Sequence, residues 1–314
     1  MKILLFGKNG QVGWELQRSL APLGTLVALD RHSSDFCGDL SDLDGLAATV
    51  AAVRPDVIVN AAAYTAVDKA EGESDVARRI NADAPAALAK AAQHIGAWLV
   101  HYSTDYVFDG NGDTPWRETD VPAPLNVYGQ TKREGEKLIA ERCARHVIFR
   151  TSWVHAARGG NFAKTMLRLA GERERLTVID DQIGAPTGAD LLADVTANVI
   201  RQLSMTPADV TLAGIYHLAA SGHTSWFGYA QHVLAQARAL DPFRVVKATE
   251  VMPVASCAFV TAARRPFNSR LDSTKLEAAF GLSMPAWQRG VDRMLAEVII
   301  PTPAAPDSNA LTTP

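Results

Sequence analysis

A tyrosine and a lysine four residues apart, Tyr128 and Lys132, form the pair with the clearest chemistry in this sequence. Residues i and i+4 of a helix share one face, so the phenol and the ammonium would point to the same place. A free tyrosine has a pKa of about 10, and we expect the nearby ammonium to lower this pKa by stabilising the phenolate. Such a pair can exchange a proton with a carbonyl or alcohol while hydride moves to or from a nicotinamide. The same spacing occurs by chance on many helices, so its meaning depends on the surrounding motifs.

A short polar run, Ser103-Thr104-Asp105, follows the apolar segment Leu99–Tyr102. A hydroxyl at the carboxyl end of such a strand could hydrogen-bond both a substrate oxygen and the oxygen of Tyr128. Serine, threonine and aspartate also favour turns and caps. The run therefore supports a catalytic site only together with the other motifs.

A glycine-rich stretch, Gly7-Lys8-Asn9-Gly10-Gln11-Val12-Gly13, lies between the first apolar run and the first helical pattern. Its spacing is one residue longer in the first gap than the G-x-G-x-x-G dinucleotide fingerprint. Small residues allow the backbone to approach a pyrophosphate, and the following helix directs its N-terminal N–H groups at the anion. The position of Gly7, Gly10 and Gly13 directly after a strand predicts a site for NADPH or NADH.

Asp30 ends the second apolar run about 20 residues further on, where a carboxylate can accept hydrogen bonds from a ribose 2′-hydroxyl. This feature favours NAD. Arg31 follows immediately, and its guanidinium could pair with the 2′-phosphate of NADP. The choice between NADH and NADPH stays open at this point.

Short runs of aliphatic and β-branched residues alternate with longer helical patterns through the first half of the chain. We predict strands at Ile3–Phe6, Leu26–Leu29, Val57–Val59, Leu99–Tyr102 and Val147–Phe149. We predict helices between them at Gly13–Leu23, Leu43–Val53, Ala77–Ile95 and Tyr128–Arg142. Continuous apolar strands are typical of a sheet covered on both faces. The pattern predicts an α/β fold with a doubly wound parallel sheet of the Rossmann type.

The second half of the chain is less regular. It contains helical patterns at Asn161–Glu172, from about Ala189, and at Trp226–Leu240, Thr274–Phe280 and Pro285–Ile300, with a late strand at Ile215–Ala219. We expect the NAD(P)-binding domain to comprise residues 1–154 plus about 189–220. A smaller mixed α/β substrate domain would comprise about 155–188 and 221–300. Residues 301–314, rich in proline, threonine and alanine, are predicted to be a disordered tail.

The composition excludes several classes of protein. The chain has 314 residues, of which 47% are hydrophobic, enough for a large core. Its 31 basic and 34 acidic residues, with a net charge of -3, argue against a broad nucleic-acid surface. Cys37, Cys143 and Cys257 lie far apart and indicate neither a disulfide framework nor a thiolate zinc site, so we expect a reducing cytoplasm. No apolar run approaches the roughly 18 residues that span a bilayer, so we expect no membrane association.

The motifs together resemble the extended short-chain dehydrogenase/reductase family. The resemblance rests on Gly7–Gly13, Asn60-Ala61-Ala62-Ala63, Ser103-Thr104, Tyr128 and Lys132. It is closest to members that use NADPH or NADH to reduce the C4 ketone of dTDP-4-dehydro-L-rhamnose to dTDP-L-rhamnose, the last step in making that sugar nucleotide. It implies a dTDP-deoxyhexose as the small-molecule substrate and a homodimer. Because some members are magnesium-dependent dimers, it also implies Mg²⁺ at Glu15 and Asp190.

The resemblance also implies roles for individual residues. Tyr128 would donate the proton, Lys132 would be its electrostatic partner and ribose contact, and Thr104 would tune the tyrosine and hold the sugar. Asp105 and Trp153, together with Thr104 and Tyr128, would contact the sugar nucleotide. The residues expected to bind the cofactor are Gly7, Gly10, Gln11, Val12, Gly13, Asp30, Arg31, Asp39, Leu40, Ala61, Ala62, Ala63, Tyr64, Thr65, Tyr102, Tyr128 and Lys132.

Two alternatives remain beside this reading. The first is another nucleotide-sugar reductase or epimerase of the same family, which nothing in the residues excludes physically. A 4,6-dehydratase fits less well, because Thr104-Asp105-Tyr106 has no carboxylate at its third position. The second alternative is a non-catalytic regulatory subunit that resembles the one of methionine adenosyltransferase.

Overall fold

A six-stranded sheet, parallel throughout, organises the first part of the molecule. The computed structural model describes residues 1–205, 210–244 and 246–300, so the predicted disordered tail at 301–314 lies outside the described residues. The strand order is β2-β1-β3-β4-β5-β10. The strands are β1 (Lys2–Phe6), β2 (Thr25–Leu29), β3 (Val57–Asn60), β4 (Trp98–Thr104), β5 (His146–Thr151) and β10 (Gly214–His217). The predicted α/β fold with a doubly wound parallel sheet is confirmed.

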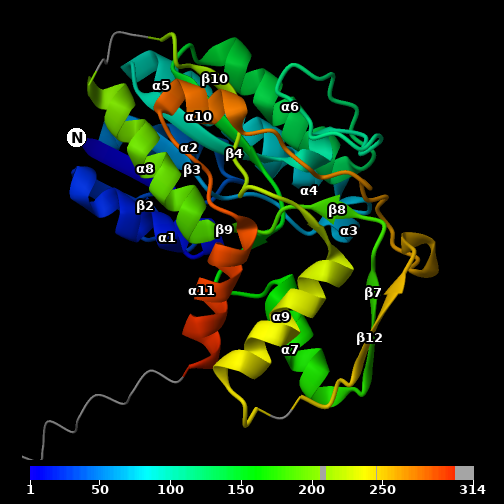
Figure 1. Ribbon diagram of the computed structural model, residues 1–314. Coiled ribbons are helices and arrows are strands. Elements are labelled where there is room, and N and C mark those ends of the chain that lie inside the picture. Colours follow the sequence, from blue (N-terminus) through cyan, green and yellow to red (C-terminus); the bar gives the residue numbers. More distant parts are fainter. Residues whose placement is uncertain (206–209, 245, 301–314) are drawn as a thin grey trace, which may run out of the picture.

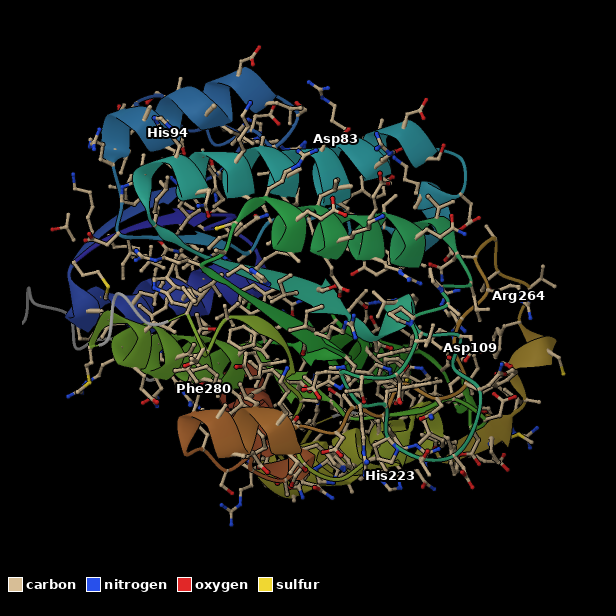
Figure 2. The ribbon with its side chains drawn as sticks, turned by 90° about the horizontal axis from the view of Figure 1, so that it is seen from above. Asp83, His94, Asp109, His223, Arg264 and Phe280 are labelled. Carbon is tan, nitrogen blue, oxygen red and sulfur yellow. The ribbon has the colours of Figure 1, made fainter. Side chains whose placement is uncertain are left out.

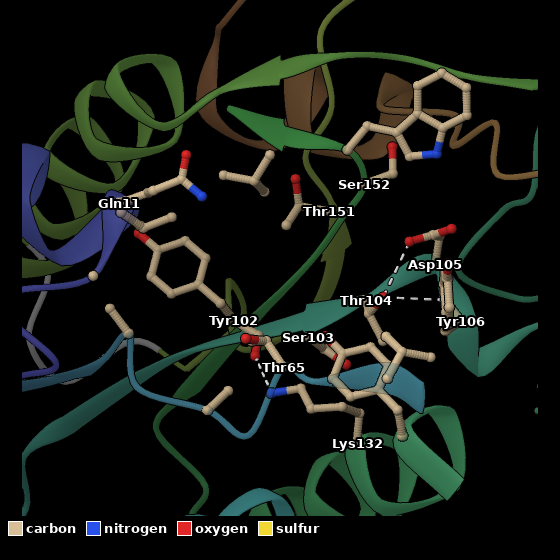
Figure 3. A pocket seen from close by; sticks show the side chains of 18 of the residues that line it. Gln11, Thr65, Tyr102, Ser103, Thr104, Asp105, Tyr106, Lys132, Thr151 and Ser152 are labelled. Carbon is tan, nitrogen blue, oxygen red and sulfur yellow. Dashed lines mark hydrogen bonds between the residues drawn. The ribbon is translucent and has the colours of Figure 1, made fainter. Parts of the chain in front are cut away.

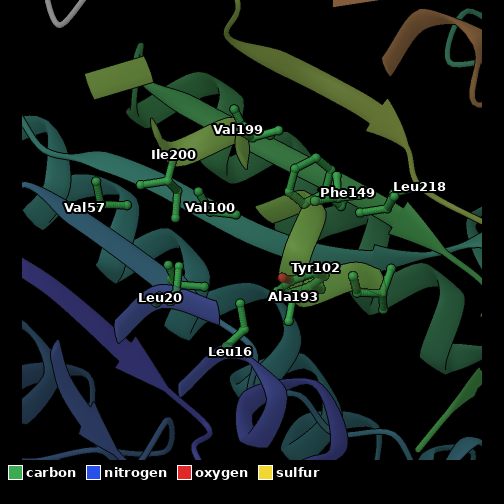
Figure 4. Packing of buried hydrophobic residues seen from close by; sticks show 14 of the residues in the cluster. Leu16, Leu20, Val57, Val100, Tyr102, Phe149, Ala193, Val199, Ile200 and Leu218 are labelled. Atoms are coloured by element: carbon green, nitrogen blue, oxygen red, sulfur yellow. The ribbon is translucent and has the colours of Figure 1, made fainter. Parts of the chain in front are cut away.

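Helices cover both faces of this sheet (Figures 1 and 2). Side chains alternate along a strand, so Ile3 and Leu5 pack on one face while Leu4 and Phe6 pack on the other. The first face is covered by α1 (Gln11–Leu20), α8 (Ala189–Met205) and α10 (Thr274–Phe280). Figure 4 shows this packing, with Leu16, Leu20 and Ala193 among the labelled side chains. The opposite face is covered by α2 (Leu43–Val53), α5 (Ala84–Ile95) and α6 (Val127–Arg142).

Two of the predicted helices differ from the observed ones by more than a shift of one or two residues at an end. The predicted helix Gly13–Leu23 begins earlier, at Gln11, and its last three residues form a 3₁₀ turn (Ala21–Leu23). The predicted helix Ala77–Ile95 is interrupted, because α4 (Ser74–Arg78) passes through a π-helical turn at Arg79–Asp83 before α5 begins. A one-turn helix, α3 (Val67–Ala70), precedes α4 and was not predicted.

A separate hydrophobic cluster lies beyond the carboxyl end of the sheet. It is built by α7 (Phe162–Glu172), α9 (Trp226–Leu240) and α11 (Trp287–Ile299), which pack with the parallel pair β7 (Arg175–Ile179) and β12 (Glu250–Val254). Two short strand pairs connect this region to the sheet: β6 (Val154–His155) with β9 (Thr187–Gly188), and β8 (Ile183–Gly184) with β11 (Thr224–Ser225). The helices were expected, whereas β6 to β9, β11 and β12 were not. The predicted domain boundaries stay a prediction.

None of the helices in the described residues is long and apolar enough to cross a membrane.

Candidate active site

A cavity of about 600 Å³ opens at the carboxyl ends of β1, β3, β4 and β5. The strand order reverses between β1 and β3, and this switch point is where open α/β sheets bind ligands. Figure 3 shows side chains from these strand ends directed into the cavity. The predicted site residues that line it are Gly7, Gly10, Gln11, Val12, Ala61, Ala62, Ala63, Thr65, Tyr102, Thr104, Asp105, Tyr128, Lys132 and Trp153.

The glycine loop forms one wall of the cavity and requires glycine at two positions. Gly7 has a φ of 90°, and a Cβ there would lie 2.8 Å from the backbone nitrogen of Ala62. A Cβ at Gly13 would lie 1.9 Å from the carbonyl oxygen of Gly7, so Gly13 is needed for close packing rather than for lining the cavity. The helix α1 begins at Gln11 with no acidic residue in its first turn. Its first N–H groups are therefore suited to a pyrophosphate.

The residues expected at the adenosine end lie outside the cavity. Asp30 directly follows β2, and its carboxylate accepts hydrogen bonds from His32 N at 2.9 Å and Ser33 Oγ at 3.2 Å and also contacts the Asn9 amide. The backbone hydrogen bond from His32 lowers the pKa of Asp30, followed by smaller contributions that include the charge of Lys8. The carboxylate is therefore ionised and already partly hydrogen-bonded within its own loop.

Four further predicted cofactor residues do not line the cavity. Arg31 is exposed, Leu40 is buried, and the Asp39 carboxylate accepts hydrogen bonds from Ser41. The Tyr64 hydroxyl donates to Glu73 Oε2 at 2.6 Å. The cofactor roles of these residues stay predictions.

The first two turns of α6 carry Tyr128 and Lys132. The helix begins there because the Asn126 side chain caps it, accepting from Gly129 N at 2.8 Å. A Cβ at Gly129 would lie 2.1 Å from the carbonyl oxygen of Tyr106, so the glycine allows α6 to approach the segment that follows β4. As a result, the phenol and the ammonium on α6 face the same cavity as Thr104 at the end of β4.

The protonation state of Tyr128 differs from the expectation. Burial raises the pKa of the phenol to about 12; a hydrogen bond with the Thr104 side chain lowers it, and the charge of Asp105 raises it. The expected lowering of the Tyr128 pKa is wrong for this structure, because burial is the largest effect on the phenol. Tyr128 therefore keeps its proton at neutral pH, which is the form that a proton donor needs.

Lys132 is almost fully buried, with 1% of its surface exposed. Its Nζ lies 2.5 Å from the carbonyl oxygen of Tyr102 and 3.1 Å from His101 Nε2. Burial lowers the pKa of Lys132 to about 8, while the charge of Glu136 raises it. A lysine with this pKa can both hold and release a proton near neutrality.

Asp105 lies next to Thr104 and is also buried. Thr104 Oγ1 donates to Asp105 Oδ1 at 3.0 Å and accepts from Tyr106 N at 3.2 Å. Burial raises the pKa of Asp105 to about 6, and hydrogen bonds led by the one from Ser269 lower it. Its second oxygen, Oδ2, has no hydrogen-bond partner in the part of the chain that the structure describes. Asp105 is among the residues that line the cavity, and an acceptor without a partner is suited to a sugar hydroxyl.

Trp153 lines the far side of the cavity together with Trp226, a residue that sequence reasoning missed. Their rings stack with centroids 3.6 Å apart and an interplanar angle of 12°. Trp153 has a φ of 48°, and a Cβ at Gly184 would lie 2.5 Å from its ring. Other unpredicted residues of the lining are Val67, Tyr106, Thr151, Ser152 and Val154, while Ser103 belongs to the polar run expected at this strand end. Thr151 carried a signal, since it is a hydroxyl residue at the end of β5.

Glu15 and Asp190 line a different, polar cavity of about 260 Å³. Each carboxylate faces an arginine: Arg18 Nε lies 3.5 Å from Glu15, and an Nη1 of Arg293 lies 3.1 Å from Asp190. Across residues 1–205, 210–244 and 246–300, no group of three His, Cys, Asp or Glu side chains could hold a metal ion. The two carboxylates do not make up a metal site by themselves.

The sheet is parallel and doubly wound, and the glycine loop lies at its switch point. The side chains of Thr104, Tyr128 and Lys132 lie in one cavity. Together these features define a nicotinamide-dependent oxidoreductase with the short-chain dehydrogenase/reductase fold. The model of the RmlD substrate binding domain family matches residues 1–300, and the chain belongs to this family.

Individual relatives agree with this assignment. The chain is 59% identical to dTDP-4-dehydrorhamnose reductase of Shigella flexneri, covering 96% of this chain and 99% of the relative, and equally similar to that of Escherichia coli K12. A solved dTDP-4-dehydrorhamnose reductase of Bacillus anthracis, in complex with NADP, aligns with a TM-score of 0.82 at 36% identity, covering 94% of this chain and 99% of that one. The corresponding structure from Clostridium acetobutylicum aligns with a TM-score of 0.84 at 32% identity, covering 95% of this chain and 99% of that one.

Proposed function

We propose that this chain reduces the C4 ketone of dTDP-4-dehydro-L-rhamnose to dTDP-L-rhamnose, using NADPH or NADH. The observation that carries the proposal is the meeting of Thr104, Tyr128 and Lys132 with the glycine loop in one cavity. The near full-length similarity to dTDP-4-dehydrorhamnose reductases supplies the substrate. The expected homodimer and cytoplasmic location stay predictions.

The residues of this cavity suit a reduction. When bound, the nicotinamide cofactor supplies the hydride that C4 of the sugar accepts. The N-terminus of α1 and the loop from Gly7 to Gly10 would hold the pyrophosphate, and Lys132 would contact the ribose. Tyr128 donates its proton to the oxygen at C4 as the alkoxide forms, and Thr104 hydrogen-bonds Tyr128 and orients it.

The nucleotide half of the substrate would occupy a second cavity of about 290 Å³. Gln182 in its lining accepts a hydrogen bond from Trp226 of the first cavity, with Nε1 and Oε1 3.2 Å apart. Arg265 in the same lining forms an ion pair with Asp68 at 2.7 Å. The neighbouring Arg264 is exposed, and no described residue pairs with its guanidinium, so Arg264 is suited to a diphosphate.

The test is turnover by the purified full chain with dTDP-4-dehydro-L-rhamnose and either reduced cofactor, followed by nicotinamide absorbance. We expect one reduced cofactor to be consumed for each dTDP-L-rhamnose formed. An epimerase would convert the sugar without net consumption of the cofactor. A non-catalytic regulatory subunit would bind cofactor without turnover, and either result with folded protein would overturn the proposal.

A further inference from the structure

A buried row of hydrogen bonds connects Ala62, in the loop that follows β3, to Lys132. Ala62 N donates to Asn60 Oδ1 at 3.2 Å, and Asn60 Nδ2 lies 3.2 Å from His101 Nδ1. The other ring nitrogen of His101, Nε2, lies 3.1 Å from Lys132 Nζ. Asn60 and His101 are register partners on β3 and β4, and each has 1% of its surface exposed. Water therefore cannot reach these two side chains, and their donors and acceptors depend on partners within the protein.

The hydrogen-bond roles along the row follow from its first member. Because Asn60 Oδ1 accepts from a backbone N–H, Nδ2 is the atom that faces His101, and an amide nitrogen only donates. His101 Nδ1 must then accept, so a neutral imidazole carries its hydrogen on Nε2. This N–H points at Lys132 Nζ. A neutral amine can accept it with its lone pair, whereas an ammonium has no lone pair.

The surroundings leave His101 no second proton. Burial and the charge of Lys132 hold the pKa of His101 well below its usual value. The other charged group acting on Lys132 is Glu136, one helical turn further along α6. The Glu136 carboxylate already forms an ion pair with Arg150 that is 2.7 Å long. The Tyr102 carbonyl is thus the fixed acceptor for the ammonium form.

We propose that Asn60 and His101 are positioning residues that stabilise the neutral amine of Lys132 and so make its ammonium a ready proton donor. The proposal rests on the proposed function. After Tyr128 has given its proton to the sugar oxygen, the phenolate needs a proton before the next turnover. The Lys132 ammonium, which lines the same cavity as Tyr128, supplies this proton and becomes an amine, which accepts the Nε2–H hydrogen bond of His101. Solvent then returns one proton to the amine.

The direct test is the tautomer of His101, which does not depend on turnover. Nitrogen NMR of the full chain at alkaline pH, with the His101 signals identified by their loss in His101→Gln, should show hydrogen on Nε2 and none on Nδ1. Hydrogen on Nδ1 or on both nitrogens would overturn the proposal. If the proposed function were wrong, His101 would still carry its hydrogen on Nε2, but the chain would not turn over the sugar nucleotide.

A second test reverses the donor and acceptor roles of His101 in this row of hydrogen bonds. Asn60→Asp keeps the acceptor for Ala62 but faces His101 with a carboxylate, which draws the hydrogen to Nδ1 and turns Nε2 into an acceptor for the ammonium. We expect the alkaline fall of kcat to move up by about 1 pH unit, the size of one hydrogen bond to a charged group. The added charge could act directly, so we expect this shift to disappear in the His101→Phe background. Asn198→Asp, which alters an exposed amide that donates to the Asp194 carbonyl, should not move it. An unmoved tautomer in Asn60→Asp, or an equal shift in the His101→Phe background, would contradict the proposal.

Discussion

Glu136 and Arg150 form a bidentate ion pair in the core, one helical turn beyond Lys132. The two pairs of atoms are 2.8 and 2.7 Å apart, and the side chains are 4% and 3% exposed. The pair joins α6 to β5 and so holds the helix that carries Tyr128 against the sheet. A buried charge that loses its partner is costly, whereas an exposed pair contributes little.

We therefore expect Arg150→Met to lower the free energy of unfolding by about 3–5 kcal/mol, because Glu136 is left as an unpaired buried charge. Urea unfolding measures this loss. The double variant Glu136→Leu/Arg150→Met should recover part of it. Arg168→Met, which removes an exposed pair with Glu172, should change stability by about 1 kcal/mol or less. Equal effects at positions 150 and 168 would contradict this account.

The pKa of Lys132 sets the expected pH dependence. The ammonium is the form that resupplies the proton, and burial lowers its pKa to about 8. The ammonium fraction falls as pH rises through this value, so kcat should fall about tenfold per pH unit above it. Tyr128, with a pKa raised to about 12, stays protonated over this range. A pH profile of kcat at saturating substrates measures the fall. A flat profile up to pH values near the pKa of Tyr128 would contradict this account. The same alkaline fall in Lys132→Met would show that another group titrates.

Gly184 allows the Trp153 indole to lie in the cavity. In Gly184→Ala the new Cβ would lie 2.5 Å from Trp153 Cε2, so the ring must move. We expect KM for the sugar nucleotide to rise about tenfold or more, since a misplacement of 1 Å can cost about 100-fold. Gly160→Ala is the matched control, because a Cβ there meets no atom within 4 Å. Steady-state kinetics measure this change. If both variants have the wild-type KM, Trp153 does not contact the substrate.

Arg264 should contribute to substrate affinity and little to the chemical step. Arg264→Gln removes the unpaired guanidinium of the second cavity, and we expect KM for the sugar nucleotide to rise about 10- to 100-fold, as loss of a hydrogen bond to a charged group predicts. The affinity for NADPH should not change. Arg142→Gln, an exposed charge at the end of α6, controls for net charge. A fall in kcat at unchanged KM would place Arg264 elsewhere in the mechanism.

The parts of the site that could be predicted from sequence are those made by neighbouring residues. The glycine loop and the Tyr128/Lys132 pair depend on a local turn and on helical spacing, and each lies on the expected element. Trp226 comes from α9 and reaches the cavity only through packing against Trp153, which no local pattern encodes. His101 reads as one more residue of a buried strand. The predicted lowering of the Tyr128 pKa was wrong. Burial, which depends on the whole fold, raises this pKa and outweighs the expected effect of Lys132.

The central claim is that Tyr128 donates the proton during reduction of the ketone. The measurement that tests it most directly is kcat of Tyr128→Phe with saturating NADPH and dTDP-4-dehydro-L-rhamnose, together with the Kd for NADPH. Removal of a general acid predicts a fall in kcat of about 100- to 10,000-fold, with the Kd nearly unchanged because the ring is retained. Wild-type kcat in this folded variant would contradict the account.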